Sequence, residues 1–261
     1  MPTREVVSLF GKLPSALDFV RIHHHGAEAI ALDSWLQASV QRLAAQNQRW
    51  PREPFRFVFT PPNALTVLVG VAAASVDRAG RSFPLVAFAR VPRSESVAAL
   101  ALASEAFCRR AALLLTAAGS LPAATLERRL RELHGPQPRE LLEAQLEWRR
   151  TFETRSLASE LLGAAADDEQ SAVASLQRWA TQPRPQGQPV FDCPMRAAPD
   201  VAAWVRLAEL AFGSTPSWVC SAHANGTRLL LSDGPLPARV PAFWGNPQLK
   251  HAQLRTLAQR V

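Results

Sequence analysis

Two nearly continuous apolar segments, separated by a short polar stretch, constrain the fold of this 261-residue chain more than any other feature of its sequence. Residues 65–74 and 83–91 are rich in β-branched and small side chains. Apolar runs of this length are typical of strands that are covered on both faces. The polar residues 75–82 therefore predict a loop that is held between two strands in the middle of a sheet.

The residues before this pair predict two more strands and a helix. Residues 4–10 are expected to form an opening strand, and a loop then runs from Gly11 to about residue 26. Apolar side chains at helical spacing predict a helix over residues 33–47, with Asp33 as its N-cap. The next strand leads through a hairpin into the first apolar segment, and it has an aromatic face made by Phe55, Phe57 and Phe59.

After residue 92 the pattern becomes helical. Helical periodicity with Pro or Gly at the boundaries is found over residues 94–118, 123–133, 139–162 and 171–180. The segment 183–199, rich in Pro, Gly and Gln, predicts an irregular connector, and residues 200–212 predict another helix. Two strands, 217–223 and 227–232, flank Asn225-Gly226, which favours a type I′ hairpin turn, and a short helix is expected over residues 247–259.

This order of strands, helices and strands predicts an α+β fold. We expect a mainly antiparallel sheet flanked by helices in α/β/α-like layers, with a helical middle segment and with the first and last strands in one sheet. The length allows a single domain over residues 1–261. Its parts are a sheet half (1–92), a helical segment (93–182) and a C-terminal helix and hairpin that complete the sheet (183–261).

Several features of the sequence favour a cytoplasmic protein. No apolar run reaches the roughly 18 residues that a membrane span requires. The N-terminus has neither a long apolar region nor a small-residue cleavage site. Three cysteines are an odd number and are too scattered for a metal site of the Cys-x-x-Cys type, so we expect reduced thiols: Cys108, Cys193 and Cys220.

The net charge of +7 raises nucleic acid or an anionic surface as alternative partners. The arginines are spread along every segment, however, and the densest set is interleaved with Glu127 and Glu132, as on a solvated helix face. A nucleic-acid binder needs its arginines on one face. We therefore expect no nucleic-acid partner and no membrane insertion.

The constellations that carry enzyme or metal chemistry are weak. Adjacent histidines such as His23, His24 and His25 are poor chelators, because neighbours in an extended loop point to opposite sides. Ser75 with Asp77 and a distant histidine is conceivable as a nucleophilic site, but serines beside aspartates at a strand end usually form turns. A phosphate-binding loop is absent. We expect no catalytic residues, no metal and no cofactor, and an enzyme with a pocket around Asp77 and Arg78 stays as the alternative.

The polar loop between the two apolar segments is the strongest candidate site. Two guanidinium groups and a carboxylate, from Asp77, Arg78 and Arg81, lie between buried strands and must be paired or partly exposed. One interpretation is an internal clamp that pins this loop to Asp18 or Lys12 in the earlier loop. The other is a surface that faces a partner protein.

Four groups of residues together resemble the TagF family. They are Gly11-Lys12-Leu13-Pro14-Ser15 followed by Asp18-Phe19-Val20-Arg21; Trp35-Leu36-Gln37; Phe55-Arg56-Phe57; and Gly70-Val71 with Ser75-Val76-Asp77-Arg78, Gly80-Arg81 and Phe83-Pro84-Leu85. A weaker C-terminal resemblance is carried by Ser217-Trp218, Gly234-Pro235-Leu236-Pro237 and Phe243. The resemblance is strong over residues 8–90 and loose beyond them.

The resemblance implies a sheet flanked by helices and a bacterial regulator without enzyme activity. Such a protein represses assembly of a type VI secretion system after translation, by binding the forkhead-associated scaffold protein of the apparatus. The two motif-bearing loops are then expected to bind the partner or to brace the surface that does. The residues concerned are Lys12, Asp18, Phe19, Arg21, Asp77, Arg78 and Arg81.

Overall fold

The computed structural model describes residues 6–61, 64–93, 97–152, 190–194, 200–223 and 226–241. Within these residues, eight strands form one sheet in the order β2-β1-β5-β4-β3-β7-β8-β6, and all neighbouring strands are antiparallel. The strands are β1 (Ser8–Gly11), β2 (Val20–Ile22), β3 (Phe55–Phe59), β4 (Thr66–Ala73), β5 (Leu85–Pro92), β6 (Val190–Pro194), β7 (Ser217–His223) and β8 (Gly226–Ser232).

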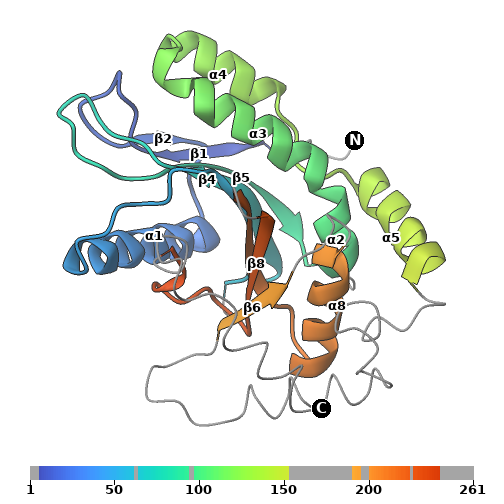
Figure 1. Cartoon of the computed structure of the whole chain (residues 1–261). Helices are drawn as coiled ribbons and strands as arrows, with labels where there is room; N and C mark the ends of the chain where they lie inside the picture. Colours follow the sequence, from blue (N-terminus) through green and yellow to red (C-terminus); the bar gives the residue numbers. More distant parts are fainter. Residues whose placement is uncertain are drawn as a thin grey trace.

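Helices cover both faces of this sheet (Figure 1). One face is covered by α1 (Ala27–Ala45) and the other by α2 (Val97–Ala103), α3 (Glu105–Ala117) and α8 (Asp200–Phe212). The remaining described helices are a short 3₁₀ turn (Ala118–Ser120), α4 (Ala123–Glu132) and α5 (Pro138–Phe152). The predicted α+β fold, an antiparallel sheet flanked by helices, is confirmed.

Burial on both faces explains why the central strands are apolar throughout. In β5, Ala87 and Ala89 belong to the core cluster beneath α2, α3 and α8, whereas Val86 and Phe88 belong to the cluster beneath α1. Successive residues of a strand point to opposite faces, so a strand between two helical layers needs apolar residues at every position. The cluster beneath α1 is the aromatic one and includes Phe10, Trp35, Phe55, Phe57, Phe59 and Phe88.

Gly70 makes this central packing possible. It lies in the middle of β4, opposite Phe57 of β3 and Phe88 of β5. A Cβ atom at this position would lie 2.5 Å from the carbonyl oxygen of Ala87 and 2.7 Å from the ring of Phe57. The absence of a side chain therefore lets the Phe57 ring lie against the β4 backbone.

Three predicted boundaries are wrong. Helix α1 begins at Ala27, where Gly26 with a φ of 86° is the N-cap, and Asp33 lies inside the helix and accepts a hydrogen bond from Gln37 Nε2. The earlier start follows from residues 27–32, which are good helix formers and bury Ala29 and Leu32. The predicted helix over residues 94–118 is divided by Ser104 into α2 and α3.

Two predicted loops contain strands. Within the loop 11–26, β2 pairs with β1, and within the connector 183–199, β6 pairs with β8. The β7–β8 pair confirms the C-terminal hairpin, although Asn225 lies outside the described residues. The predicted helices over residues 171–180 and 247–259, and the part of the predicted helix 139–162 beyond α5, also lie outside them. Among the described helices, none combines the length and apolar character needed to cross a membrane.

Candidate functional site

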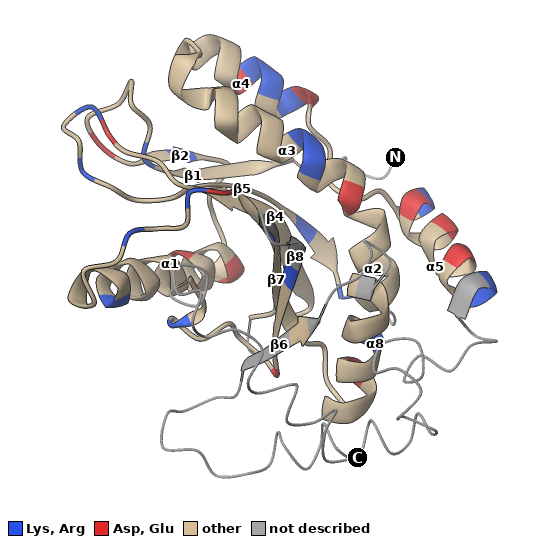
Figure 2. Ribbon diagram, in the orientation of Figure 1, with Lys and Arg blue, Asp and Glu red and all other residues tan. Residues whose placement is uncertain are grey.

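The antiparallel register brings two motif-bearing loops to the same end of the sheet. Residues 12–19 follow β1 and residues 74–84 join β4 to β5, and Phe10 near the end of β1 pairs with Val86 near the start of β5. We call these two segments the loop pair. Figure 2 shows blue and red charged positions side by side in these loops, beyond the ends of β1 and β4.

Asp77 lies at the centre of the loop pair. Its side chain is fully buried, and Oδ2 is 2.9 Å from Nζ of Lys12 and 2.7 Å from Nε of Arg81. Oδ1 accepts hydrogen bonds from the backbone N–H groups of Ala79 and Arg81, at 3.0 and 2.8 Å. Both carboxylate oxygens are therefore fully used inside the protein.

These contacts keep Asp77 ionised. Burial alone raises the pKa of a carboxyl group, but the hydrogen bonds from Lys12 and from the backbone and side chain of Arg81 outweigh it. The pKa of Asp77 is consequently held well below its ordinary value. A carboxylate that is buried, ionised and surrounded by donors serves as a structural anchor.

Backbone contacts join the two loops into one unit. The N–H of Arg78 donates to the carbonyl oxygen of Ala16 at 2.8 Å, and Oγ of Ser75 donates to the carbonyl oxygen of Lys12 at 2.7 Å. The guanidinium of Arg81 also donates to the carbonyl oxygen of Leu17. The internal clamp predicted from the sequence is present, and its partner in the first loop is Lys12 and not Asp18.

Aromatic stacking holds the other end of the first loop. The Phe19 ring is stacked on Phe10, with centroids 5.5 Å apart, and meets the edge of Phe83 at 4.8 Å. The guanidinium of Arg21 lies 5.3 Å from the Phe10 centroid and 5.5 Å from the Phe19 centroid. Lys12 Nζ lies 5.4 Å from the Phe19 ring, so the clamp and the stack are in contact.

The seven predicted site residues thus fall into two groups. Lys12, Asp77 and Arg81 brace the loops from within, and Phe19 is half-buried in the stack. By contrast, Asp18, Arg21 and Arg78 are exposed. Asp18 accepts a hydrogen bond from the N–H of Phe19, and Arg78 has no side-chain ion pair or hydrogen bond with any residue that the structure describes.

Two exposed apolar side chains accompany these charges. Leu17 is 62% exposed and Val76 is 39% exposed, one in each loop. Exposed leucine or valine residues are common singly, but here they lie on loops whose backbone is fixed by the clamp. The loop pair therefore presents apolar groups and guanidinium groups on a rigid base.

The three consecutive histidines have separate surroundings. His23, with a φ of 52°, lies with Nδ1 3.3 Å from the carbonyl oxygen of Val7, and the carbonyl of His25 accepts a hydrogen bond from Arg90. The ring of His24 lies 4.6 Å from that of Phe10, and its buried Nε2 has no hydrogen-bond partner within the described part of the chain. Desolvation by this burial lowers the pKa of His24.

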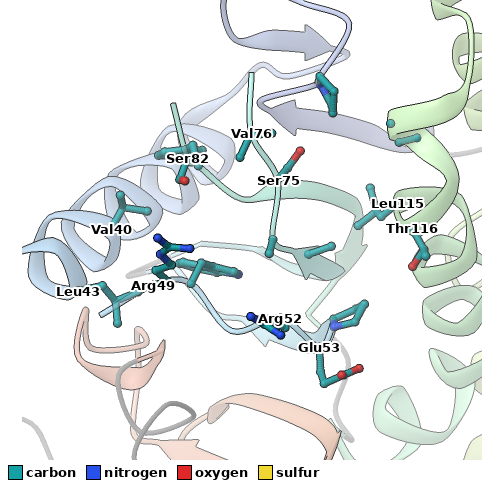
Figure 3. Close-up of a pocket in the computed structure, with 18 of the residues that line it drawn as sticks. Val40, Leu43, Arg49, Arg52, Glu53, Ser75, Val76, Ser82, Leu115 and Thr116 are labelled. Carbon is teal, nitrogen blue, oxygen red and sulfur yellow. The ribbon is translucent and has the colours of Figure 1, made fainter. Parts of the chain in front are cut away.

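A groove beside the loop pair was not predicted. It has a volume of about 900 Å³ and opens between the segment 46–54, the second loop and the end of α3 (Figure 3). Figure 3 shows Arg49 and Arg52 projecting from the first of these walls. The only signal in the sequence is a tryptophan flanked by arginines and prolines, Arg49-Trp50-Pro51-Arg52.

The alternative enzyme site loses its main component in this arrangement. Both oxygens of Asp77 are occupied by Lys12, Arg81 and backbone N–H groups, so the carboxylate does not face the groove as a base. Ser75 donates its hydroxyl to Lys12 and has no histidine partner among the described residues. Within the same residues, no three His, Cys, Asp or Glu side chains gather as metal ligands.

The fold and the loop pair together define a helix-covered α+β domain with a braced loop surface at one end of its sheet. Residues 8–133 match the family model described as "TagF N-terminal domain, Type VI secretion system-associated". The chain therefore carries a TagF N-terminal domain over these residues, and the family recognised from the sequence motifs is confirmed. All seven predicted site residues lie within the matched range.

A solved structure extends the likeness of the fold to most of the chain. The crystal structure of PA0076 from Pseudomonas aeruginosa PAO1 is similar, with a TM-score of 0.54 over 91% of this chain and 93% of that chain. The sequence identity is 17%, so the likeness shows the fold alone. Among curated proteins, no sequence matches this chain.

Proposed function

We propose that this chain is a non-enzymatic negative regulator of type VI secretion system assembly, which acts in the cytoplasm by binding the forkhead-associated scaffold protein of the apparatus. The observation that carries the proposal is the match of residues 8–133 to a domain associated with type VI secretion. The motifs that define this domain form the loop pair. A surface built from family motifs and held rigid from within is suited to binding a protein partner.

The exposed groups of the loop pair suit such a surface. Arginine and apolar side chains dominate the energetics of protein interfaces, because they combine contact area with directional hydrogen bonds. Arg21 and Arg78 supply guanidinium groups, and Leu17 and Val76 supply apolar area. The buried Lys12–Asp77 pair is assigned to bracing and not to direct contact.

The three parts of the chain then have different tasks in this proposal. Residues 1–92 form the sheet half that bears the loop pair, and residues 93–182 supply the helical layer. Residues 183–261 complete the sheet with the C-terminal hairpin. We treat the whole of residues 1–261 as one TagF-like domain.

Nucleic acid is not the partner in this proposal, because opposite charges alternate on the helical layer. On α4 and α5, Arg128 pairs with Glu132 and Arg139 with Glu143, and Figure 2 shows both colours along each helix. Such helices do not form a basic face.

A pull-down of the forkhead-associated scaffold protein by the full chain tests the proposal. The double variant Leu17→Ser/Arg78→Ala removes one exposed leucine and one exposed arginine from the loop pair. A matched control, Arg109→Ala/Leu113→Ser, makes the same two changes on α3, where Leu113 is 68% exposed. We expect the loop variant to weaken binding roughly tenfold or more, as for interface hot spots, and the control to bind normally.

Normal binding by a folded Leu17→Ser/Arg78→Ala protein contradicts the loop-pair surface. Repression is tested separately in cells that carry the secretion system. Removing the chain should increase assembly of the apparatus, and the loop variant should fail to restore repression. If removal lowers assembly, the chain is not a negative regulator.

A further inference from the structure

The groove beside the loop pair has a mixed lining. Its apolar side chains include Leu43 at the end of α1, Trp50 and Phe83, together with Leu115 of α3. Ser75, Val76 and Ser82 of the second loop form another part of the wall (Figure 3). The groove is therefore continuous with the proposed partner surface, since both use the second loop.

Two arginines give the groove its electrostatic character. Arg49 and Arg52 line it and are exposed, and Glu53 is the acidic residue of the same segment. Within the part of the chain that the structure describes, neither guanidinium makes an ion pair or a hydrogen bond. Arg78, in the loop that forms the opposite wall, is likewise without an ion pair there. The groove thus offers an occupant two or three guanidinium groups and few competing carboxylates.

Two polar atoms beside these arginines are also unsatisfied. The side-chain oxygen Oε1 of Gln48 and the indole Nε1 of Trp50 line the groove and are buried without a hydrogen-bond partner among the described residues. One is an acceptor and the other a donor, which is the complement of a peptide group. Gln48 is only half-buried, so its side chain can turn toward an occupant.

We propose that this groove binds an acidic linear segment of a partner protein, with carboxylates at Arg49 and Arg52 and an apolar side chain against Trp50, Phe83 and Leu115. The inference rests on the proposed function in one respect, namely that the segment belongs to the protein docked on the loop pair. Arginine binds carboxylates through paired hydrogen bonds, and this sets the acidic character of the segment.

The shape and charge of the groove select this occupant over two others. Small-molecule sites usually bury most of their ligand, whereas this groove is open along one side and suits a segment whose remaining surface is covered by its own protein. A second copy of this chain is disfavoured because the chain carries a net charge of +7, which opposes contact at a basic groove.

Fluorescence anisotropy with the full chain tests this inference directly. The probe is a short fluorescein-labelled peptide that alternates Glu and Leu, and the comparison peptide has Gln in place of each Glu. We expect the acidic peptide to bind the wild-type protein more tightly than the Gln peptide. Each guanidinium removed should weaken binding roughly tenfold, the value of a charged hydrogen bond.

Charge reversal locates the site. Arg49→Glu/Arg52→Glu should abolish binding of the acidic peptide, and Arg49→Gln/Arg52→Gln gives a milder test if the reversed variant folds poorly. The control Arg109→Glu/Arg110→Glu makes the same change of charge at exposed positions of α3 and should bind normally. The inference is overturned if the groove and control variants bind alike, or if the Gln peptide binds as tightly as the acidic one.

Two further outcomes separate this inference from the proposed function. If Arg49→Glu/Arg52→Glu retains the acidic peptide while Leu17→Ser/Arg78→Ala loses the scaffold protein, the groove assignment is wrong and the regulator remains. If sedimentation reveals a dimer of the wild-type chain that the groove variant dissociates, the occupant is a second copy, which also overturns the inference.

Discussion

Replacing Lys12 by methionine tests whether the buried ion pair braces the loop pair. Methionine keeps an unbranched stem of similar length but removes the ammonium group that lies 2.9 Å from Asp77 Oδ2. The carboxylate then stays buried with one fewer donor. Since burial penalises an ion that lacks a partner, the substitution should destabilise the fold although its stem remains apolar.

The size of the effect follows from burial and from the remaining contacts. Removing one partner of a buried ion pair typically costs about 3–5 kcal/mol. The Lys12 side chain is 8% exposed, which places it in this class. Arg81 and two backbone N–H groups remain as donors, so we expect a loss of about 2–3 kcal/mol for Lys12→Met. For a chain of this length, that corresponds to a fall in Tm of roughly 5–10 °C.

Arg81→Gln provides the contrast. The Arg81 side chain is 60% exposed, and exposed ion pairs contribute about 0–1 kcal/mol, so its Tm should fall by less than about 3 °C. Thermal unfolding monitored by circular dichroism measures both variants. A Lys12→Met protein that melts within about 2 °C of the wild type would refute the bracing role. So would an Arg81→Gln protein that loses as much stability as Lys12→Met.

Three more predictions concern pH and packing. Because the pKa of Asp77 is lowered on folding, its contribution is complete above its unfolded pKa and is lost in acid, so Tm should fall more steeply below about pH 4 in the wild type than in Asp77→Asn. The pKa of His24 is also lowered from 6.5, so the unfolded chain takes up this proton first; Tm should fall as the pH drops below about 6.5, and His24→Gln should reduce that fall. Gly70→Ala should cost more than about 3 kcal/mol in urea unfolding, because the new methyl group overlaps the Ala87 carbonyl.

The sequence predicted those elements whose burial leaves a clear pattern. Strands β4 and β5 are covered on both faces, so nearly every residue is apolar and the runs stand out. The edge strand β2 has only three residues, Val20–Ile22, with exposed Arg21 in the middle. Such a strand is specified by backbone pairing with β1 and hardly by its own side chains, which is why it was predicted as loop.

The clamp and the groove differ in the same way. A buried carboxylate between core strands requires a cation, so the polar loop itself predicted a clamp and offered Lys12 among its candidates. The groove has no local requirement of this kind. Its walls come from α1, the segment 46–54, the second loop and α3, and their proximity depends on the whole sheet and both helical layers.

The separation of bracing residues from exposed residues gives the proposed surface a testable logic. Ordering a flexible loop costs about 1–2 kcal/mol per residue, and loops that are already ordered in the free protein do not incur that cost on binding. Lys12→Met should therefore weaken partner binding and lower Tm together, although Lys12 is buried. Arg78→Ala should weaken binding and leave Tm unchanged, because its side chain contributes no ion pair within the described structure. If both variants changed Tm and binding in proportion, the loops would act only through stability, and the exposed guanidinium would have no separate role in recognition.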